Sequence, residues 1–250
     1  MNARIRELER IAAMYHLNDA VPDKFIEDIG QQHCCDWLQT LIAPTDHVIE
    51  LGLGEGITLA RLAPKARRYT VIEGAASLVE KVARSHPDLE LVQTLFEDHQ
   101  PAESCDKLLA LHVLEHVDDP VALARHLRGW LKPEGELIVV VPNRDSLHRQ
   151  LAVIMGLQPA LDTLSARDHL VGHQRVYDLP LLEQHLRDAG FEPFERRGFF
   201  LKTLPNSMML DHSPALIRAL NSLGDRLPAT MGANLAVRAR RVSLDLDETR

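Results

Sequence analysis

Short apolar runs and helical stretches alternate along the chain between residues 47 and 141. The apolar runs are typical of strands buried on both faces, and the stretches between them repeat apolar residues at helical spacing. This alternation predicts a mostly parallel sheet with helices on both faces. The expected strands are residues 47–51, 68–73, 89–94, 107–111 and 135–141, and the expected helices are residues 57–63, 75–85 and 121–131.

Other segments flank this alternating core. Residues 2–16 and 23–41 carry apolar side chains at helical spacing and are expected to form two leading helices. Beyond residue 142 the alternation is interrupted by irregular stretches. We expect a weakly periodic segment at 143–178, a helix at 179–189, a strand at 191–197, an irregular and partly helical segment at 200–231, a last strand at 234–242 and a frayed tail at 245–250.

Composition excludes several classes of protein. The 250 residues are 45% hydrophobic and 26% charged, which suits one well-filled domain with a small insertion. A net charge of −8 argues against a broad phosphate-binding surface, so no nucleic-acid partner is expected. No apolar run approaches the roughly 20 residues of a membrane helix, and the charged amino terminus lacks a signal-peptide core. We therefore expect a cytoplasmic protein without a membrane partner, whose cysteines Cys34, Cys35 and Cys105 are reduced.

The sequence E-L-G-L-G-E-G at residues 50–56 follows the first expected strand and precedes a helix. Glycines allow a sharp turn and a close approach of the backbone to a ligand, so a nucleotide-like ligand fits here. The dinucleotide fingerprint G-x-G-x-x-G would need glycine at position 57, which is Ile57. The Gly-Lys-Ser/Thr ending of a phosphate-binding loop is also missing, so ATP hydrolysis is not supported.

Glu73 ends the second expected strand, about 20 residues after the glycines. Most glutamates at strand ends are only solvated acids. Here the position is the crevice in which open α/β sheets bind ligands, so we expect the carboxylate to accept hydrogen bonds from both hydroxyls of a ribose.

Four ordered motifs carry a resemblance to a known family. They are E-L-G-L-G-E-G at 50–56, Glu73, L-F-E-D at 95–98 and H-V-L-E-H-V at 112–117. Together they resemble class I S-adenosylmethionine-dependent methyltransferases, particularly the group that contains ubiquinone-biosynthesis and small-molecule enzymes. The similarity covers residues 46–142 and the helix and strand that end at residue 197. It implies an α/β Rossmann-like fold with a seven-stranded sheet, S-adenosylmethionine as methyl donor and S-adenosylhomocysteine as product.

The resemblance also implies roles for individual residues and segments. The glycines would cradle the methionine portion, Glu73 would hold the ribose, and residues 96–98 would contact the adenine, with the choice between the two acids there left open. Glu50 would orient the glycine loop or the cofactor's ammonium group, and His112 would line the floor beneath the sulfonium. The implied cofactor residues are Glu50, Gly52, Gly54, Gly56, Glu73, Gly74, Phe96, Glu97, Asp98 and His112. The implied organisation is leading helices over the cofactor at 1–45, a cofactor-binding core at 46–142, an acceptor-pocket insertion at 143–178, and a return to the core at 179–244 with a second insertion at 200–231.

The sequence His112-Val113-Leu114-Glu115-His116 formally matches the H-x-x-E-H pattern of inverted zinc peptidases. That pattern needs both histidines on one helical face, whereas His112 directly follows a buried strand, so no metal is expected. His116 is open to two interpretations, a loop or capping histidine and a general base that faces the acceptor. His173 is a second candidate for the base.

Residues 143–178 are rich in histidine and arginine in an otherwise acidic chain. A guanidinium matches a carboxylate or phosphate in two-point geometry, so we expect a small anionic acceptor, methylated at oxygen or nitrogen. Tyr177 could equally pack in the core. Apolar residues at 199–201 and 208–210 suit either a pocket cover or a homodimer interface. The candidate acceptor-binding residues are Arg144, His148, His169, Arg175 and Tyr177.

Three other functions compete with this reading. An RNA- or protein-modifying methyltransferase is disfavoured by charge. An NAD(P)-dependent oxidoreductase is disfavoured by the glycine spacing, and tight nicotinamide binding would favour it. A noncatalytic protein could keep the fold and bind cofactor without turnover.

Overall fold

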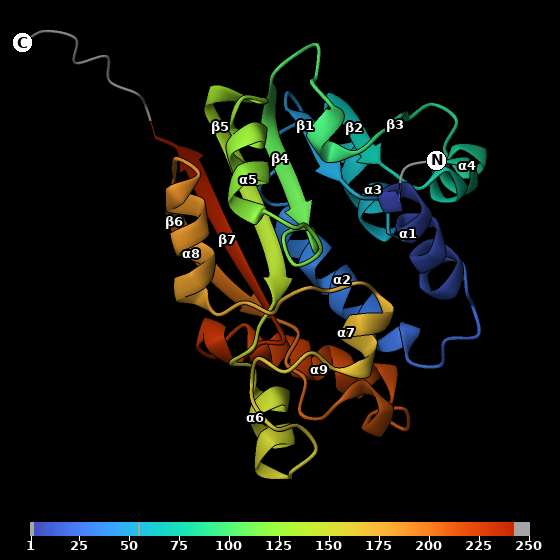
Figure 1. Ribbon diagram of the computed structural model, residues 1–250, viewed down its shortest axis with the longest axis vertical. Coiled ribbons are helices and arrows are strands. Elements are labelled where there is room, and N and C mark those ends of the chain that lie inside the picture. The colour runs from blue at the N-terminus through green and yellow to red at the C-terminus, as the bar shows by residue number, and fades with distance from the viewer. Residues whose placement is uncertain (1–2, 55, 243–250) are drawn as a thin grey trace, which may run out of the picture.

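The computed structural model describes residues 3–54 and 56–242, and its centre is one seven-stranded sheet (Figure 1). Glu55 of the glycine motif and the tail expected at 245–250 lie outside the described residues. The strands are β1 (His47–Leu51), β2 (Arg68–Glu73), β3 (Glu90–Gln93), β4 (Cys105–Leu111), β5 (Leu131–Pro142), β6 (Phe191–Phe199) and β7 (Asn234–Arg241).

The strand order is β3-β2-β1-β4-β5-β7-β6, with β7 antiparallel to both of its neighbours. The remaining pairs are parallel; Leu51 of β1, for example, lies beside Ile72 of β2 and Ala110 of β4. The predicted mostly parallel, Rossmann-like α/β fold is confirmed. The order reverses direction at β1 and β4, whose carboxyl ends therefore open into the crevice where such sheets bind ligands.

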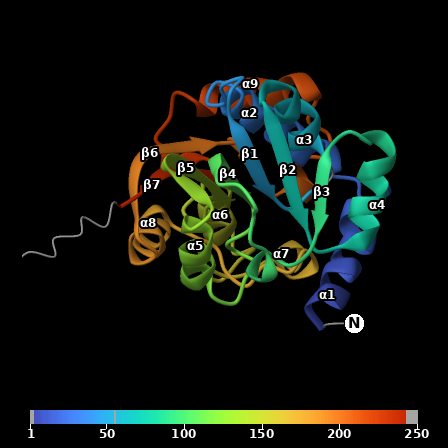
Figure 2. The same ribbon diagram turned by 90° about the horizontal axis from the view of Figure 1, so that it is seen from above.

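Helices cover both faces of the sheet (Figures 1 and 2). The α-helices are α1 (Ala3–Ile11), α2 (Lys24–Leu38), α3 (Ile57–Leu62), α4 (Ala76–Ser85), α5 (Pro120–Arg128), α6 (Leu147–Ile154), α7 (Ala166–Leu170), α8 (Leu179–Asp188) and α9 (Pro214–Gly224). The described residues also form five shorter helical segments: the π-helix η1 (Ala12–His16) and the 3₁₀-helices η2 (Ala63–Lys65), η3 (Phe96–Asp98), η4 (Asn206–Met208) and η5 (Ala229–Met231).

Alternate residues of the central strands enter two separate cores. Val48 and Leu109 pack with α2, α3, α4 and α9, whereas Ile49 and Leu108 pack with α5 and α8. A strand that buries both faces needs a continuous apolar run, which explains the runs seen in the sequence. The three cysteines are buried free thiols.

The structure differs from the predicted elements at three places. The first helix passes into the π-helix η1 at Ala12. Strand β5 begins at Leu131, where the sequence predicted the end of a helix, because α5 stops at Arg128 and Leu131 pairs with Cys105. The segment 143–178, expected only as weakly periodic, contains two helices, α6 and α7.

Among the described residues, we find no helix that combines the length and the apolar character needed to cross a bilayer.

Candidate active site

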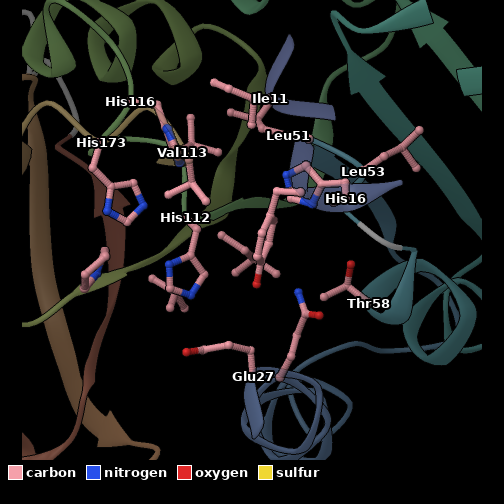
Figure 3. Close-up of a pocket in the computed structure, with 18 of the residues that line it drawn as sticks. Ile11, His16, Glu27, Leu51, Leu53, Thr58, His112, Val113, His116 and His173 are labelled. Atoms are coloured by element: carbon pink, nitrogen blue, oxygen red, sulfur yellow. The ribbon is translucent and has the colours of Figure 1, made fainter. Parts of the chain in front are cut away.

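A cavity of about 350 Å³ opens at the carboxyl ends of the central strands. Leu51, Glu73, Leu111 and Pro142, which lie at the ends of β1, β2, β4 and β5, all line it. Residues of the amino-terminal elements α1, η1 and α2 also line the cavity, as do residues of the 143–178 segment. Figure 3 shows His112, His116 and His173 together on one wall, away from the wall with Leu53 and Thr58.

The glycine loop between β1 and α3 supplies one wall of the cavity. Gly52, Gly54 and Gly56 all have left-handed backbone conformations, with φ angles of 84°, 49° and 82°. Side chains rarely adopt these angles, so the turn itself requires glycine. A Cβ added at Gly52 or Gly54 would meet no described atom within 4 Å, so open space lies beside the loop. Gly52 and Gly54 line the cavity, and Gly56 does not.

Glu73 ties the end of β2 to this loop. Its Oε2 accepts a hydrogen bond from the backbone N–H of Leu53 at 2.9 Å, and its Oε1 accepts one from that of Ala75 at 2.7 Å. Burial raises the pKa of Glu73 against the opposing effect of these hydrogen bonds. A carboxylate has about four lone-pair sites, so each oxygen keeps acceptor capacity for a ligand in the cavity.

Glu50 also lines the cavity, but its contacts are not with the glycine loop. Its Oε2 accepts a hydrogen bond from the hydroxyl of Tyr69 at 2.8 Å, and Thr58 is a second partner. Burial raises the pKa of Glu50 to about 7, although both hydrogen bonds act in the opposite direction. The side chain therefore bridges β1, β2 and α3 beneath the cavity.

The far end of the cavity is formed by the turn after β3. Phe96 and Glu97 line it, whereas Asp98 does not. Gly74 lines it as well, and an added Cβ there would come within 2.5 Å of Cδ1 of Leu8. The first helix therefore packs directly over the end of β2.

The loop after β4 carries a buried carboxylate between two histidines. Residues 112–119 form turns and bends without a helix, and His112 has a left-handed φ of 57°. Nδ1 of His112 lies 3.1 Å from Oε1 of Glu115, whose side chain is fully buried. Burial opposes the charges of both groups, but this contact outweighs it, raising the pKa of His112 and lowering that of Glu115.

His116 and His173 lie against each other in an edge-to-face arrangement, with ring centroids 4.7 Å apart. Burial lowers the pKa of His116 to about 4. Nδ1 of His173 lies 2.9 Å from Oδ1 of Asp168, and Oδ2 of that carboxylate accepts a hydrogen bond from Arg149 at 2.7 Å. The 143–178 segment thus holds His173 against the loop after β4.

A cluster of charges closes another side of the cavity. Nζ of Lys202 lies 3.4 Å from Oε1 of Glu27, and Asn206 donates to the same oxygen at 2.6 Å. Arg167 of α7 pairs with Asp23 and Glu27 and donates to the hydroxyl of Tyr15. Burial opposes ionisation of Glu27, but Lys202, Arg167 and the hydrogen bond from Asn206 outweigh it and lower its pKa to about 2.

Three buried polar atoms in or near the cavity wall have no hydrogen-bond partner among the described residues. Nδ1 of His16 and Nδ1 of His148 belong to residues that line the cavity, and Oε2 belongs to Glu115, which is fully buried and does not line it. Leaving such atoms unpaired costs roughly 1–3 kcal/mol each, so they are natural contacts for a bound molecule or ion.

Four of the five residues predicted to bind the acceptor do not line the cavity. Arg144 pairs with Asp178, and His169 is exposed on α7. Tyr177 is fully buried in the second core, so the alternative prediction that it packs in the core is the one that the structure supports. Arg175 donates to the carbonyl oxygens of Leu114, Val117 and Asp118 at 2.9, 2.5 and 3.3 Å. His148 is the one member of this set that reaches the cavity.

Other cavity residues were missed by sequence reasoning. Glu27 and Lys202 lie 175 positions apart, in a helix and in an irregular segment, and no spacing rule joins them. Glu115 belongs to the H-x-x-E-H pattern at 112–116, which the sequence analysis considered as a zinc site only in a helical conformation. The S-x-x-D pattern at 165–168 is a capping box that would have located α7 and its buried Asp168.

The apolar segment at 199–201 belongs to the interior. Phe199 and Phe200 are buried, line the cavity and pack in the first core. Met208 and Leu210 remain exposed, whereas Met209 is buried.

The sheet order, the antiparallel β7, and a glycine loop tied to the acid that ends β2 define the class I methyltransferase architecture. The methyltransferase domain family matches residues 26–195, more than half of the chain. The chain belongs to this family of S-adenosylmethionine-dependent methyltransferases, which confirms the resemblance seen in the sequence.

Individual relatives agree with this assignment. The ubiquinone biosynthesis O-methyltransferase of Xanthomonas axonopodis pv. citri (strain 306) is 35% identical over 171 residues, which cover 65% of this chain and 70% of that protein. The trans-aconitate 2-methyltransferase of Escherichia coli O157:H7 is 28% identical over 165 residues, which cover 64% of this chain. The match spans 62% of the length of that E. coli relative.

A solved structure shows the same fold along nearly the whole chain. It is the 1,6-didemethyltoxoflavin-N1-methyltransferase of Burkholderia thailandensis with bound 1,6-didemethyltoxoflavin and S-adenosylhomocysteine. Its TM-score is 0.60 at 14% identity, covering 96% of this chain and 89% of that one.

Proposed function

We propose that this protein transfers a methyl group from S-adenosylmethionine to an oxygen or nitrogen atom of a small anionic acceptor. The observation that carries the proposal is one cavity with two chemically different parts. The glycine loop and Glu73 line one part, and a cluster of histidines, arginines and Lys202 lines the other. A methyl transfer needs donor and acceptor side by side in one water-poor space.

The first part fits the donor. Open space beside Gly52 and Gly54 would receive the methionine portion, and the free lone pairs of Glu73 would accept from the ribose hydroxyls. Phe96 and Glu97 would contact the adenine; since Asp98 is outside the cavity, we assign the recognition of its amine to Glu97. Glu50, although occupied by Tyr69 and Thr58, lies close enough to the loop to face the ammonium group.

The second part suits an anion. Lys202, Arg149 and Arg167 border it, although each has an acidic partner within the protein. The names of two relatives support the same chemistry, since trans-aconitate is a carboxylate and the ubiquinone-biosynthesis enzyme is an O-methyltransferase. We therefore favour oxygen as the methylated atom.

The donor's sulfonium supplies a good leaving group, so the protein's own task is to align the acceptor and receive its proton. We place His112 next to the transferred group because it lines the cavity directly after β4, one of the two strands at which the sheet order reverses. His116 and His173 form the wall that would face the acceptor atom and its proton. Arg167 excludes water by joining α7 to the amino-terminal helices through Asp23 and Tyr15.

Two measurements test the proposal. Calorimetric titration should show saturable binding of S-adenosylhomocysteine and none of NADH, while tight binding of the nicotinamide alone would overturn it. A metabolite extract incubated with the protein and methyl-labelled donor should yield a labelled small acid. Label found only in RNA or protein would assign the acceptor to a macromolecule instead, and cofactor binding without transfer to any acceptor would indicate a noncatalytic protein.

A further inference from the structure

One carboxylate and two imidazoles come together beside the cavity. His116 and His173 line it, and the fully buried Glu115 lies next to them. One ligand atom from each lies within 4.8 Å of the other two. Nε2 of His173 is 4.0 Å from Oε1 of Glu115, and the rings of His116 and His173 are in contact. Loops after two different strands, β4 and β5, contribute these residues, so the cluster depends on the folded chain.

The carboxylate in this cluster lacks a full set of partners. Glu115 is fully buried, and its Oε2 has no hydrogen-bond donor among the described residues, while Oε1 is shared with His112. Burying an unpaired carboxylate oxygen is costly unless something else compensates its charge. His112 compensates Glu115 through Oε1, so Oε2 is the atom left open to a ligand such as a bound cation.

The second histidine is oriented as metal-binding histidines usually are. A ligating imidazole commonly donates its other N–H to a carboxylate, which fixes the ring and the nitrogen that faces the metal. Nδ1 of His173 makes such a contact with Asp168 at 2.9 Å, leaving Nε2 toward Glu115. Arg149 and the capping Ser165 in turn hold Asp168.

We propose that Glu115, His116 and His173 bind a divalent first-row transition-metal ion. Two nitrogens and one carboxylate oxygen suit Zn²⁺, Fe²⁺ or Co²⁺ better than Mg²⁺ or Ca²⁺, which prefer oxygen ligands alone. Zinc bonds of about 2.0–2.2 Å place neighbouring ligand atoms roughly 3.4 Å apart, so the cluster must contract slightly by side-chain rotation.

Three protein ligands leave at least one position of the ion open. His116 and His173 line the cavity, so an oxygen of the acceptor could occupy that position. A bound cation lowers the pKa of a coordinated hydroxyl, so the acceptor would release its proton to water on binding, and the histidines would hold the ion rather than receive the proton themselves. This last role rests on the proposed function, whereas metal binding does not.

The test is a binding measurement that needs no turnover. Protein stripped with a chelator and dialysed against Zn²⁺ or Co²⁺ should retain one equivalent, as measured by elemental analysis. Bound Co²⁺ should show the visible absorption of a site with nitrogen ligands, and a large excess of Mg²⁺ should not displace it. Wild-type protein that retains no metal would overturn the proposal outright, whatever its methyltransferase activity.

Variants locate the ion. His116→Ala and His173→Ala should each weaken Co²⁺ binding by at least about tenfold, and Asp168→Asn, which removes only the support behind His173, should weaken it by about 10–100-fold. His169→Ala is the matched control, because this exposed histidine lies on α7 outside the cavity. Binding that survives both ligand substitutions would place the metal elsewhere and overturn the assignment. The absorption spectrum of wild-type protein remains decisive if a variant fails to fold.

Discussion

Oε2 of Glu73 accepts a hydrogen bond from the backbone N–H of Leu53 at 2.9 Å, which joins the end of β2 to the glycine loop after β1. The other oxygen accepts from the N–H of Ala75, so both oxygens face donors of the protein itself. Glu73 thus supports the loop that we propose to cradle the cofactor, in addition to its proposed contact with the ribose. Sequence reasoning had assigned it only the second role.

Replacing Glu73 should weaken binding of S-adenosylhomocysteine. We expect Glu73→Ala to cost about 1–3 kcal/mol, since a charged acceptor of two hydroxyls is lost. Calorimetry with the cofactor product and with an analogue that lacks both ribose hydroxyls separates the two roles. The wild type should bind the product much more tightly than the analogue, and the variant should bind the two about equally. If both proteins discriminate equally, Glu73 does not bind the ribose and only supports the glycine loop.

The glycine loop allows a second test with a matched control. Gly54 and Gly156 have φ angles of 49° and 71°, and an added Cβ meets no described atom within 4 Å at either position. Gly54→Ala and Gly156→Ala should therefore lose similar stability, about 1–2 kcal/mol, from backbone strain alone. Only Gly54 lines the cavity, so only its substitution should also weaken S-adenosylhomocysteine binding, and Gly54→Val should weaken it further. Unchanged affinity in both Gly54 variants would argue against the cradle.

Most of the fold could be predicted because it depends on local patterns. The apolar runs of β1, β2 and β4 predicted strands that the structure confirms, since a strand buried on both faces cannot contain many polar residues. The boundary of β5 could not be predicted in this way. Its first residues, Leu131 to Glu134, include a lysine, a proline and a glutamate, and the pairing of Leu131 with Cys105 extends the strand.

Glu50 predicts a pH dependence of stability. Burial raises its folded pKa from 4.5 to about 7, so between these values the native state holds a proton that the unfolded state has released. Glu50 therefore adds no penalty below pH 4.5, and stability falls as the pH rises through about 7, by roughly 3 kcal/mol in total. Glu50→Gln should remove this loss, so that its stability relative to wild type improves between about pH 5 and about pH 8. Urea unfolding at both values measures it, with the exposed Glu192→Gln as control; the same pH slope in wild type and Glu50→Gln would refute the prediction.

The candidate site could be predicted only in part, and Arg175 shows why. Its residue type favoured a bound anion, but an arginine is equally able to bind carbonyl oxygens, and three of them lie at the turn after β4. Which partner it takes depends on how two distant segments approach each other. The part proposed for the cofactor depends on one strand-loop-helix unit and its neighbouring strand, so local spacing was enough to predict residues that line one cavity.

Arg175→Ala should accordingly disturb the loop that carries His112 and His116. We expect a loss of about 1–3 kcal/mol in stability, because carbonyl oxygens of Leu114 and Val117 lose a charged donor. Amide hydrogen exchange should rise in residues 112–119, and kcat should fall more than the acceptor KM rises. Arg144→Ala, which removes an arginine of the same segment, is the control. A rise in the acceptor KM alone, with unchanged hydrogen exchange, would instead support the original prediction that Arg175 binds the acceptor.

Lys202 offers the most direct test of an anionic acceptor. Its ammonium group lies 5.3 Å from the centre of the Phe200 ring and 3.4 Å from Glu27, and the side chain is only 10% exposed. Because a hydrogen bond to a charged group contributes about 1.5–3 kcal/mol, Lys202→Met should raise the KM of the acid found in the labelling screen by roughly 10–100-fold. S-adenosylhomocysteine affinity should remain unchanged, since Lys202 lies in the part of the cavity that we propose for the acceptor. Removing the lysine alone leaves the negative charge of Glu27 less compensated, so the double variant Glu27→Gln, Lys202→Met should recover stability without recovering KM.

A neutral amide of the same acceptor tests whether Lys202 recognises charge. The amide should bind the wild type and the Lys202→Met variant equally, and an equal loss of binding for acid and amide would show that Lys202 does not recognise charge.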